Sequence, residues 1–97
     1  MDYNVKNNEA SQRFEVSIDG QLAVLEYRFY KGSMALMHTA VPTELEGKGV
    51  GSALARYAFG FAKDNHFPVM VYCGFVADFL KKHPEYEAQL DRTYHKQ

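Results

Sequence analysis

The residues best suited to chemistry begin with a glycine-rich turn. Glycines stand at every second position in the stretch Glu46-Gly47-Lys48-Gly49-Val50-Gly51-Ser52, directly before an apolar, alanine-rich run. Successive glycines let backbone N–H groups point the same way, and a helix start adds unpaired donors and the positive end of the helix dipole. We therefore expect these amides to bind a phosphate or diphosphate.

Two further side chains are candidates for catalysis. Cys73 is the only cysteine in the chain. It is either a nucleophile, if a helix N-terminus or a basic neighbour stabilises its thiolate, or a small apolar residue that ends a buried strand. His38 is a candidate general base because imidazole titrates near neutral pH, although a hydrogen-bonded structural histidine is the more common case. Lys48 is either a solvated charge or a contact to phosphate. The remaining histidines lack metal-ligand spacing with Cys73, so we predict no metal site.

An antiparallel meander of three strands is expected to carry His38. Apolar residues alternate with polar ones over residues 13–18, which predicts a half-buried strand. Asp19-Gly20 is a hairpin signal, and the return strand Gln21–Tyr30 is apolar enough on both sides to suggest cover on both faces. The turn Lys31-Gly32 leads to a third strand, Met34–Val41, which Pro42 ends. Residues 1–12 read as a flexible lead-in.

A helix from Val50 to Asp64 is expected after the glycine turn, with Asn65 as the residue that follows its C-terminus. A buried strand, Val69–Cys73, a second helix, Val76–Lys82, and a terminal turn or two that then fray complete the order β-β-β-α-β-α. This α/β (α+β) chain thus contains one parallel strand pair joined by the glycine-turn helix. Because such crossovers are right-handed, the glycine turn and Cys73 should reach the same edge of the sheet.

Composition limits the classes of partner. The chain has 97 residues, which we interpret as one domain over residues 13–97, and a formal net charge of −1. This charge argues against a nucleic-acid or anionic-membrane surface. No apolar run is long enough to span a bilayer and no signal peptide is evident. A single cysteine cannot form an internal disulfide, which fits a cytoplasmic protein.

Three phosphate-binding interpretations compete for the glycine turn. A Walker-type loop needs Gly-Lys-Ser/Thr, whereas Lys48 precedes Gly49. A dinucleotide fingerprint needs a glycine where Ser52 stands, and a carboxylate at the end of the next strand, which is Tyr72-Cys73. Gly49-x-Gly51 opening a helix resembles instead the acyl-CoA loop of the Gcn5-related N-acetyltransferases (GNAT), with Glu46 where glutamine or arginine is usual.

More specifically, the chain resembles the small, single-domain branch of that superfamily over about residues 13–86. Three motifs carry the resemblance in the right order, and they are His38-Thr39-Ala40-Val41-Pro42, Leu45-Glu46-Gly47-Lys48-Gly49-Val50-Gly51, and Cys73-Gly74-Phe75-Val76 followed by His83-Pro84-Glu85. Ala40 departs from relatives that are expected to carry an acidic residue there, which weakens the case for a carboxylate base on this strand.

The resemblance implies an acetyl-CoA-dependent N-acetyltransferase with an unknown amine acceptor, present as a monomer or weak homodimer. The diphosphate would lie on the amides of 46–52, and the pantetheine would lie beside the backbone of Thr39–Val41. An N–H near Val41 would polarise the thioester carbonyl. Either the amine attacks the thioester directly or Cys73 first takes the acetyl group. The alternative is a non-catalytic CoA-binding or regulatory module, because Asp19-Gly20 replaces the helical pair that shapes the acceptor pocket in longer relatives.

Overall fold

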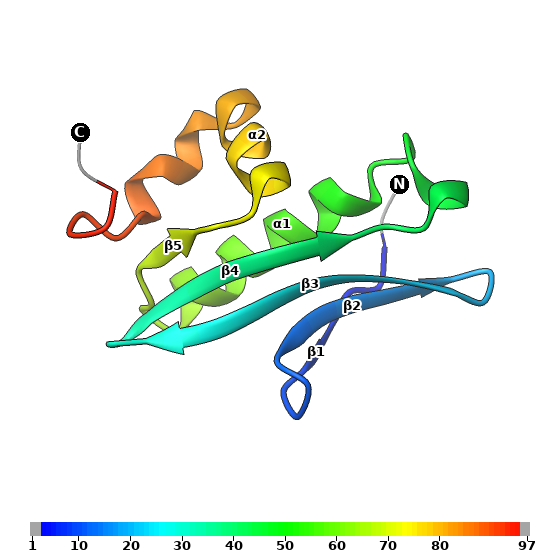
Figure 1. Cartoon of the computed structure of the whole chain (residues 1–97). Helices are drawn as coiled ribbons and strands as arrows, with labels where there is room; N and C mark the ends of the chain where they lie inside the picture. The colour runs from blue at the N-terminus through cyan, green and yellow to red at the C-terminus, as the bar shows by residue number, and fades with distance from the viewer. Residues whose placement is uncertain (1–2, 96–97) are drawn as a thin grey trace.

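A computed structural model describes residues 3–95 and contains one five-stranded sheet in the order β1-β2-β3-β4-β5 (Figure 1). Its strands are β1 Lys6–Asn8, β2 Arg13–Ile18, β3 Gln21–Tyr30, β4 Ser33–Ala40 and β5 Val69–Val71. Neighbours from β1 to β4 are antiparallel, and β4 and β5 are parallel. The helices are α1 Val50–Asp64 and α2 Gly74–Lys82, with 3-10 helices at Thr43–Leu45 and Pro84–Gln89. The predicted α/β class is confirmed, including the parallel pair that α1 joins.

Both helices contribute to one hydrophobic core on one face of the sheet. α1 packs on β2, β3 and β4, while α2 packs on α1, β4 and β5. Phe14 lies at the centre of this core, fully buried, with its ring 4.7 Å from Tyr27 and 5.5 Å from Phe61 between centroids. Within residues 3–95 no helix covers the opposite face, and no helix is long and apolar enough to cross a membrane.

The N-terminal segment corrects the expectation of a flexible lead-in over residues 1–12. Residues 6–8 form β1, in which Asn7 pairs with Phe14. The Tyr27 hydroxyl donates to Asn7 Oδ1 at 2.6 Å, which ties this polar strand to the core. Polar residues without alternation give no strand signal, so the pairing depends on contacts that are distant in sequence. Residues 1–2 lie outside the described residues.

The predicted hairpin turn is confirmed, whereas the expected double cover of β3 is wrong. Asp19 and Gly20 have φ of 51° and 77°, as a tight two-residue turn requires. Ala23 and Leu25 face the helices and are fully buried, but Tyr30 on the other face is 56% exposed. Aromatic and β-branched residues fill this strand whether or not a second layer covers them.

The parallel strands β4 and β5 separate at their C-terminal ends. Their last paired residues are Leu36 and Val71, and Tyr72 N–H donates to the Leu36 carbonyl at 2.9 Å. β5 therefore ends two residues before Cys73, and α2 begins at Gly74 rather than at Val76. A bulge after Leu36 re-aligns β4 on β3, so residues 38–40 of β4 pair with β3 alone.

One detail at the C-terminal end of α1 also differs from expectation. α1 presents the predicted buried stripe, including Leu54, Ala58 and Phe59. Its left-handed residue, however, is His66 with φ of 60°, whereas Asn65 keeps a negative φ and donates from Nδ2 to the Phe61 carbonyl at 2.9 Å. The side chain of Asn65 thus caps the helix, and the reversal comes one residue later.

The C-terminal segment protects the outer edge of β5 instead of fraying up to residue 95. Leu90 pairs with Val69, and Asp91 N–H donates to the Val69 carbonyl at 2.8 Å. Val71 N–H donates to His95 Nε2 at 2.9 Å. These bonds satisfy backbone groups that an open edge strand would expose. Residues 96–97 lie outside the described residues.

Asp91 makes the attachment of this segment sensitive to acid. The Ser33 hydroxyl donates to its carboxylate and, with the backbone N–H groups of Tyr94 and Thr93, lowers the pKa of Asp91 below its ordinary 3.8. A lowered pKa in the folded state stabilises the protein above the unfolded pKa, and the contribution is lost as pH falls through the folded value. We expect Ser33→Ala to raise the Asp91 pKa, measured by NMR titration of its carboxyl carbon. Ser17→Ala, on exposed β2 surface, should leave it unchanged.

Candidate functional site

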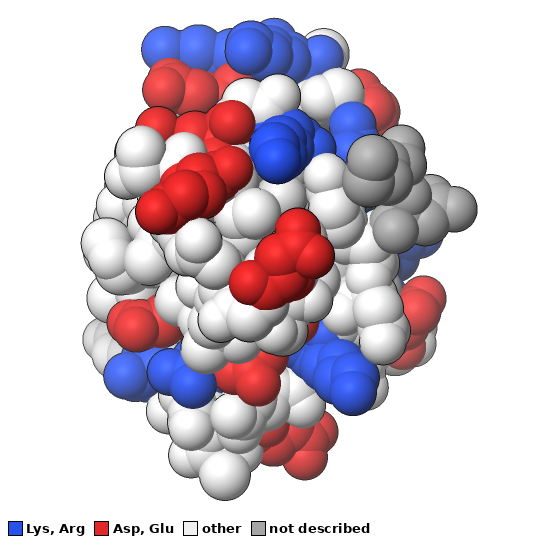
Figure 2. All heavy atoms as spheres, turned by 90° about the vertical axis from the view of Figure 1, so that its right-hand side faces the viewer, with Lys and Arg blue, Asp and Glu red and all other residues white. Residues whose placement is uncertain are grey.

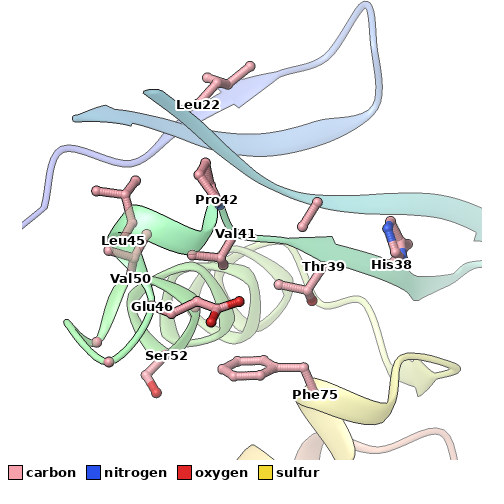
Figure 3. Close-up of a pocket in the computed structure, with 14 residues that line it drawn as sticks. Leu22, His38, Thr39, Val41, Pro42, Leu45, Glu46, Val50, Ser52 and Phe75 are labelled. Carbon is pink, nitrogen blue, oxygen red and sulfur yellow. The ribbon is translucent and has the colours of Figure 1, made fainter. Parts of the chain in front are cut away.

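A cleft of about 940 Å³ opens where β4 and β5 diverge, beside the N-terminus of α1 (Figure 3). Its walls come from the start of β3, the end of β4, the turn before α1, the first turn of α1 and the start of α2. The lining residues are Leu22, His38, Thr39, Ala40, Val41, Pro42, Leu45, Glu46, Gly47, Gly49, Val50, Gly51, Ser52 and Phe75. Nine of the eleven residues predicted for the site lie in this lining, and Lys48 and Cys73 do not.

The glycine turn leaves backbone donors free at the cleft. Gly47 and Gly49 have φ of 79° and 78°, and Gly49 is the N-cap of α1. Ala53 N–H donates to the Gly49 carbonyl at 3.0 Å, which is the first bond of the helix. The N–H groups of residues 50–52 precede that bond, and within residues 3–95 they have no backbone acceptor. The arrangement suits an anion that accepts several hydrogen bonds at the positive end of the helix dipole.

Glu46 takes a different position from the one expected. Its N–H donates to the Thr43 carbonyl at 3.2 Å, so this amide is already paired, and the free donors begin at Gly47. Its carboxylate points into the cleft, toward the space between Thr39 and Ser52 (Figure 3). A negative charge here opposes an anionic ligand, and the side chain has to turn outward for one to bind.

The lead-in segment holds the glycine turn from outside. The Tyr3 hydroxyl donates to the Lys48 carbonyl at 2.6 Å, across 45 residues of sequence. Lys48 has an exposed side chain that does not line the cleft, so its role here is through its backbone. The bond fixes the peptide that precedes Gly49.

Removing this bond is expected to weaken anion binding at the glycine turn modestly. A neutral hydrogen bond contributes about 0.5–1.5 kcal/mol, so we expect Tyr3→Phe to weaken binding of the acetyl-CoA expected from the sequence about two- to tenfold through a looser turn. Isothermal titration calorimetry would measure the change. Tyr57→Phe, which removes a hydroxyl from a 40% exposed ring on α1, is the matched control. Equal affinities for the two variants would contradict a role for the Tyr3 bond.

Phe75 forms a wall of the cleft that sequence reasoning did not assign to the site. Its ring is 41% exposed and lies against Gly51, where an added Cβ would come within 2.6 Å of the ring. Because Gly51 has no side chain, the Phe75 ring can lie against its backbone and room remains for a ligand. The only sequence signal was its place in the Cys73-Gly74-Phe75-Val76 motif.

Cys73 lies one side chain behind the cleft. The residue is 6% exposed, and its Sγ lies 3.0 Å from Thr39 Oγ1 in a hydrogen bond whose donor is either group. Thr39 itself lines the cleft and points toward Phe75 (Figure 3). Cys73 is also the N-cap of α2, so the helix dipole favours a negative charge near its sulfur. The structure thus brings thiol and cleft together with a hydroxyl between them.

His38 extends from the opposite face of β4. Successive residues of a strand alternate sides, and Figure 3 shows the imidazole directed away from Thr39 and Phe75. The residue is exposed, and its cross-strand partner is Glu26. His38 and Cys73 therefore approach the cleft from different sides of the sheet.

The electrostatic character of this end of the molecule matches a site built from backbone. In Figure 2 acidic and basic side chains are interspersed, and most of the surface carries neither. Glu44, Glu46 and Lys48 are all exposed near the glycine turn. Without a continuous positive field, any anion must be bound by the oriented amides.

Comparisons with known proteins agree with this geometry. A family model described as GCN5-related N-acetyl-transferase matches residues 13–90. Protein NATD1 of Bos taurus is 30% identical over 83 residues, covering 82% of this chain and 74% of the relative. Protein NATD1 of Xenopus tropicalis is 28% identical, covering 82% and 76%. The solution structure of a GCN5-like protein from Staphylococcus aureus superposes with a TM-score of 0.71 at 28% identity, covering 98% of this chain and 97% of that one.

Proposed function

Because the chain belongs to the GCN5-related N-acetyltransferase family, we propose that it binds acetyl-CoA in the cleft beside α1 and transfers the acetyl group to an amine. One observation carries the proposal. The unpaired amides at the start of α1 and the unpaired edge of β4 after Leu36 line the same cleft. The first group suits a diphosphate and the second suits an extended chain with amide groups.

The residues fit a bound coenzyme A in two places. The amides of residues 47–52 would hold the diphosphate, a narrower set than expected because Glu46 N–H is already paired. The backbone of Thr39–Val41 would pair with the pantetheine amides as a neighbouring strand does. Glu46 is the one poor fit, and its carboxylate would have to leave the cleft.

Acetyl-CoA supplies an acetyl group activated as a thioester. In the proposed chemistry the Val41 N–H polarises the acetyl carbonyl. The Cys73 thiolate forms a bond to the acetyl carbon, the bond from that carbon to the CoA sulfur breaks, and CoA leaves as a thiolate. An amine then attacks acetyl-Cys73, the Cys73 sulfur leaves as a thiolate, and solvent water takes the proton that the amine loses, because His38 extends from the opposite face of β4. The Thr39 hydroxyl, 3.0 Å from Sγ, orients the thiol.

The test of binding is an acetyl-CoA titration read by backbone amide shifts. We expect the largest shifts at residues 47–52 and 39–41, in one saturable event. Amide shifts at other residues, or no shifts at all, would show that acetyl-CoA does not bind in this cleft. Free thiol released from acetyl-CoA in the presence of polyamines, lysine peptides and amino-terminal peptides then measures transfer.

A second candidate function has an observation of its own. The two-residue turn Asp19-Gly20 joins β2 to β3 directly, and within residues 3–95 no helix covers the face toward which His38 points. An acceptor would meet an open surface there. Saturable binding of acetyl-CoA without thiol release on any amine class would favour a CoA-binding or regulatory module.

A further inference from the structure

A second recess of about 310 Å³ lies at the other end of β4, on the face opposite α1. Tyr30, Lys31, Met70, Asp91, Thr93 and Tyr94 line it. Ser33 begins β4 beside this recess, whereas Ala40 ends β4 at the cleft, so about eight residues of extended strand, roughly 25 Å, separate the two. No residue lines both. The proposed acetyl transfer does not involve this second recess.

Its walls are aromatic and exposed. Tyr30 is 56% exposed on β3, and Tyr94 is 44% exposed on the C-terminal segment. Tyr72 of the β5–α2 junction supports Tyr94, with ring centroids 4.9 Å apart. Met70, only 4% exposed, lies beneath them. Tyrosine rings carry negative charge on their faces, which attracts cations, and a thioether floor excludes water without offering a positive charge.

A fixed carboxylate stands in the same lining. Asp91 accepts hydrogen bonds from the Ser33 hydroxyl and from the backbone N–H groups of Thr93 and Tyr94, the latter two at 2.8 and 3.2 Å. These three donors fix the orientation of the carboxylate. They also lower the pKa of Asp91, so the group is ionised at neutral pH. The recess therefore combines a permanent negative charge with aromatic faces.

The side-chain ammonium group of Lys31 already contacts one of these aromatic rings. Lys31 Nζ lies 5.4 Å from the centroid of the Tyr30 ring, within the range of a cation–π contact. Lys31 occupies a turn position with φ of 50°, and its side chain is exposed. It is thus at hand as a weak intramolecular competitor for any external cation.

We propose that this recess binds an alkylammonium group, such as a lysine side chain or a methylated amine, independently of the acetyl-CoA cleft. The aromatic faces of Tyr30 and Tyr94 would contact the cation, and Asp91 would neutralise it. The ligand is defined by its ammonium group and not by a particular partner molecule. Two sources are distinguished by experiment: a primary ammonium, as in lysine, and a quaternary one, as in trimethylated amines.

The experiment uses choline and its neutral isostere 3,3-dimethyl-1-butanol, with n-butylammonium as the primary amine. Each is added to the whole chain while the Met70 methyl signal and the tyrosine ring signals are followed by NMR. We expect saturable shifts with choline or n-butylammonium at least about fivefold stronger in affinity than with the alcohol, because only the ammonium gains the cation–π and carboxylate terms. Which amine binds more tightly identifies the source. Equal binding of the isostere, or no shift at Met70, would overturn the proposal.

Three substitutions test the named contacts in the same titration. Asp91→Asn keeps the acceptor oxygen and removes the charge, and we expect about fivefold weaker binding. Tyr30→Leu, which leaves the C-terminal segment untouched, should weaken binding about threefold, and Lys31→Gln should strengthen it about twofold by removing the competitor. Asp78→Asn, an exposed carboxylate on α2, is the control. If Asp91→Asn and Tyr30→Leu both bind like Asp78→Asn, the recess is not a cation site.

Discussion

Gly49→Val is expected to weaken acetyl-CoA binding by at least about 100-fold. Gly49 has φ of 78° and is the N-cap of α1. A β-branched residue in the left-handed region costs on the order of 1–3 kcal/mol, and it escapes that strain by rotating to a negative φ. The rotation would turn the N–H groups of the first helical turn away from the cleft. Hydrogen bonds to a charged group contribute about 1.5–3 kcal/mol each, so losing two of them accounts for the expected factor.

The control lies on the same helix. Gly60 has open space around it and an ordinary helical backbone, so Gly60→Ala should leave binding unchanged and stabilise α1 by about 1 kcal/mol. Thermal unfolding of the valine variant checks that the fold persists, and Gly49→Ala supplies a milder strain if it does not. Calorimetry that finds wild-type affinity in a folded Gly49→Val would show that these amides do not hold the ligand.

Local signals in the sequence predicted most of the fold. The turn at Asp19-Gly20 needs only two residues that tolerate positive φ, and both adopt it. The stripe of α1 repeats every 3.6 residues, and its predicted inner residues Leu54 and Ala58 are fully buried. The parallel pairing of β4 with β5 then follows from chain geometry, because a helix joins them.

Features that depend on distant contacts were not predictable in this way. β1 consists of Lys6, Asn7 and Asn8, whose polar side chains resemble a loop until Tyr27 supplies a partner. The edge of β5 is closed by residues that the sequence suggested would fray, because its free N–H and C=O groups find partners there. Propensity describes a residue's own preference, whereas these pairings depend on side-chain and backbone groups of residues that are distant in the sequence.

The candidate site also contains one part that local sequence predicts and another part that depends on distant elements. The glycine spacing identified the helix N-terminus, since backbone freedom is a local property. The side chains around it were harder to place, because a side chain's direction depends on the element beneath it. Glu46 turns its carboxylate into the cleft, and Phe75 lies on Gly51 from a helix 24 residues further along the chain. Phe75 belonged to a motif that the sequence singled out, but the motif did not indicate that its ring lines the cleft.

Cys73→Ala is expected to lower kcat for acetyl transfer by at least about 100-fold while changing acetyl-CoA affinity less than about twofold, because the thiol acts only after binding. Cys73 does not line the cleft, so the substitution leaves the binding surface intact. Thiol release from acetyl-CoA with a saturating amine gives kcat, and calorimetry gives the affinity. Mass spectrometry of the wild type mixed with acetyl-CoA alone should show one acetyl group on the peptide that contains Cys73.

The 3.0 Å contact between Cys73 Sγ and Thr39 Oγ1 supplies a graded companion to this experiment. Thr39→Val keeps the shape of the side chain and removes the hydroxyl, so we expect about a tenfold loss of kcat if Thr39 orients the thiol. Thr39→Ser should restore most of the rate, because it returns the hydroxyl. Full turnover by Cys73→Ala would instead mean that the amine attacks the thioester directly. The sulfur would then be a small apolar side chain at the start of α2, and acetyl-CoA binding at the glycine turn would be unaffected by that result.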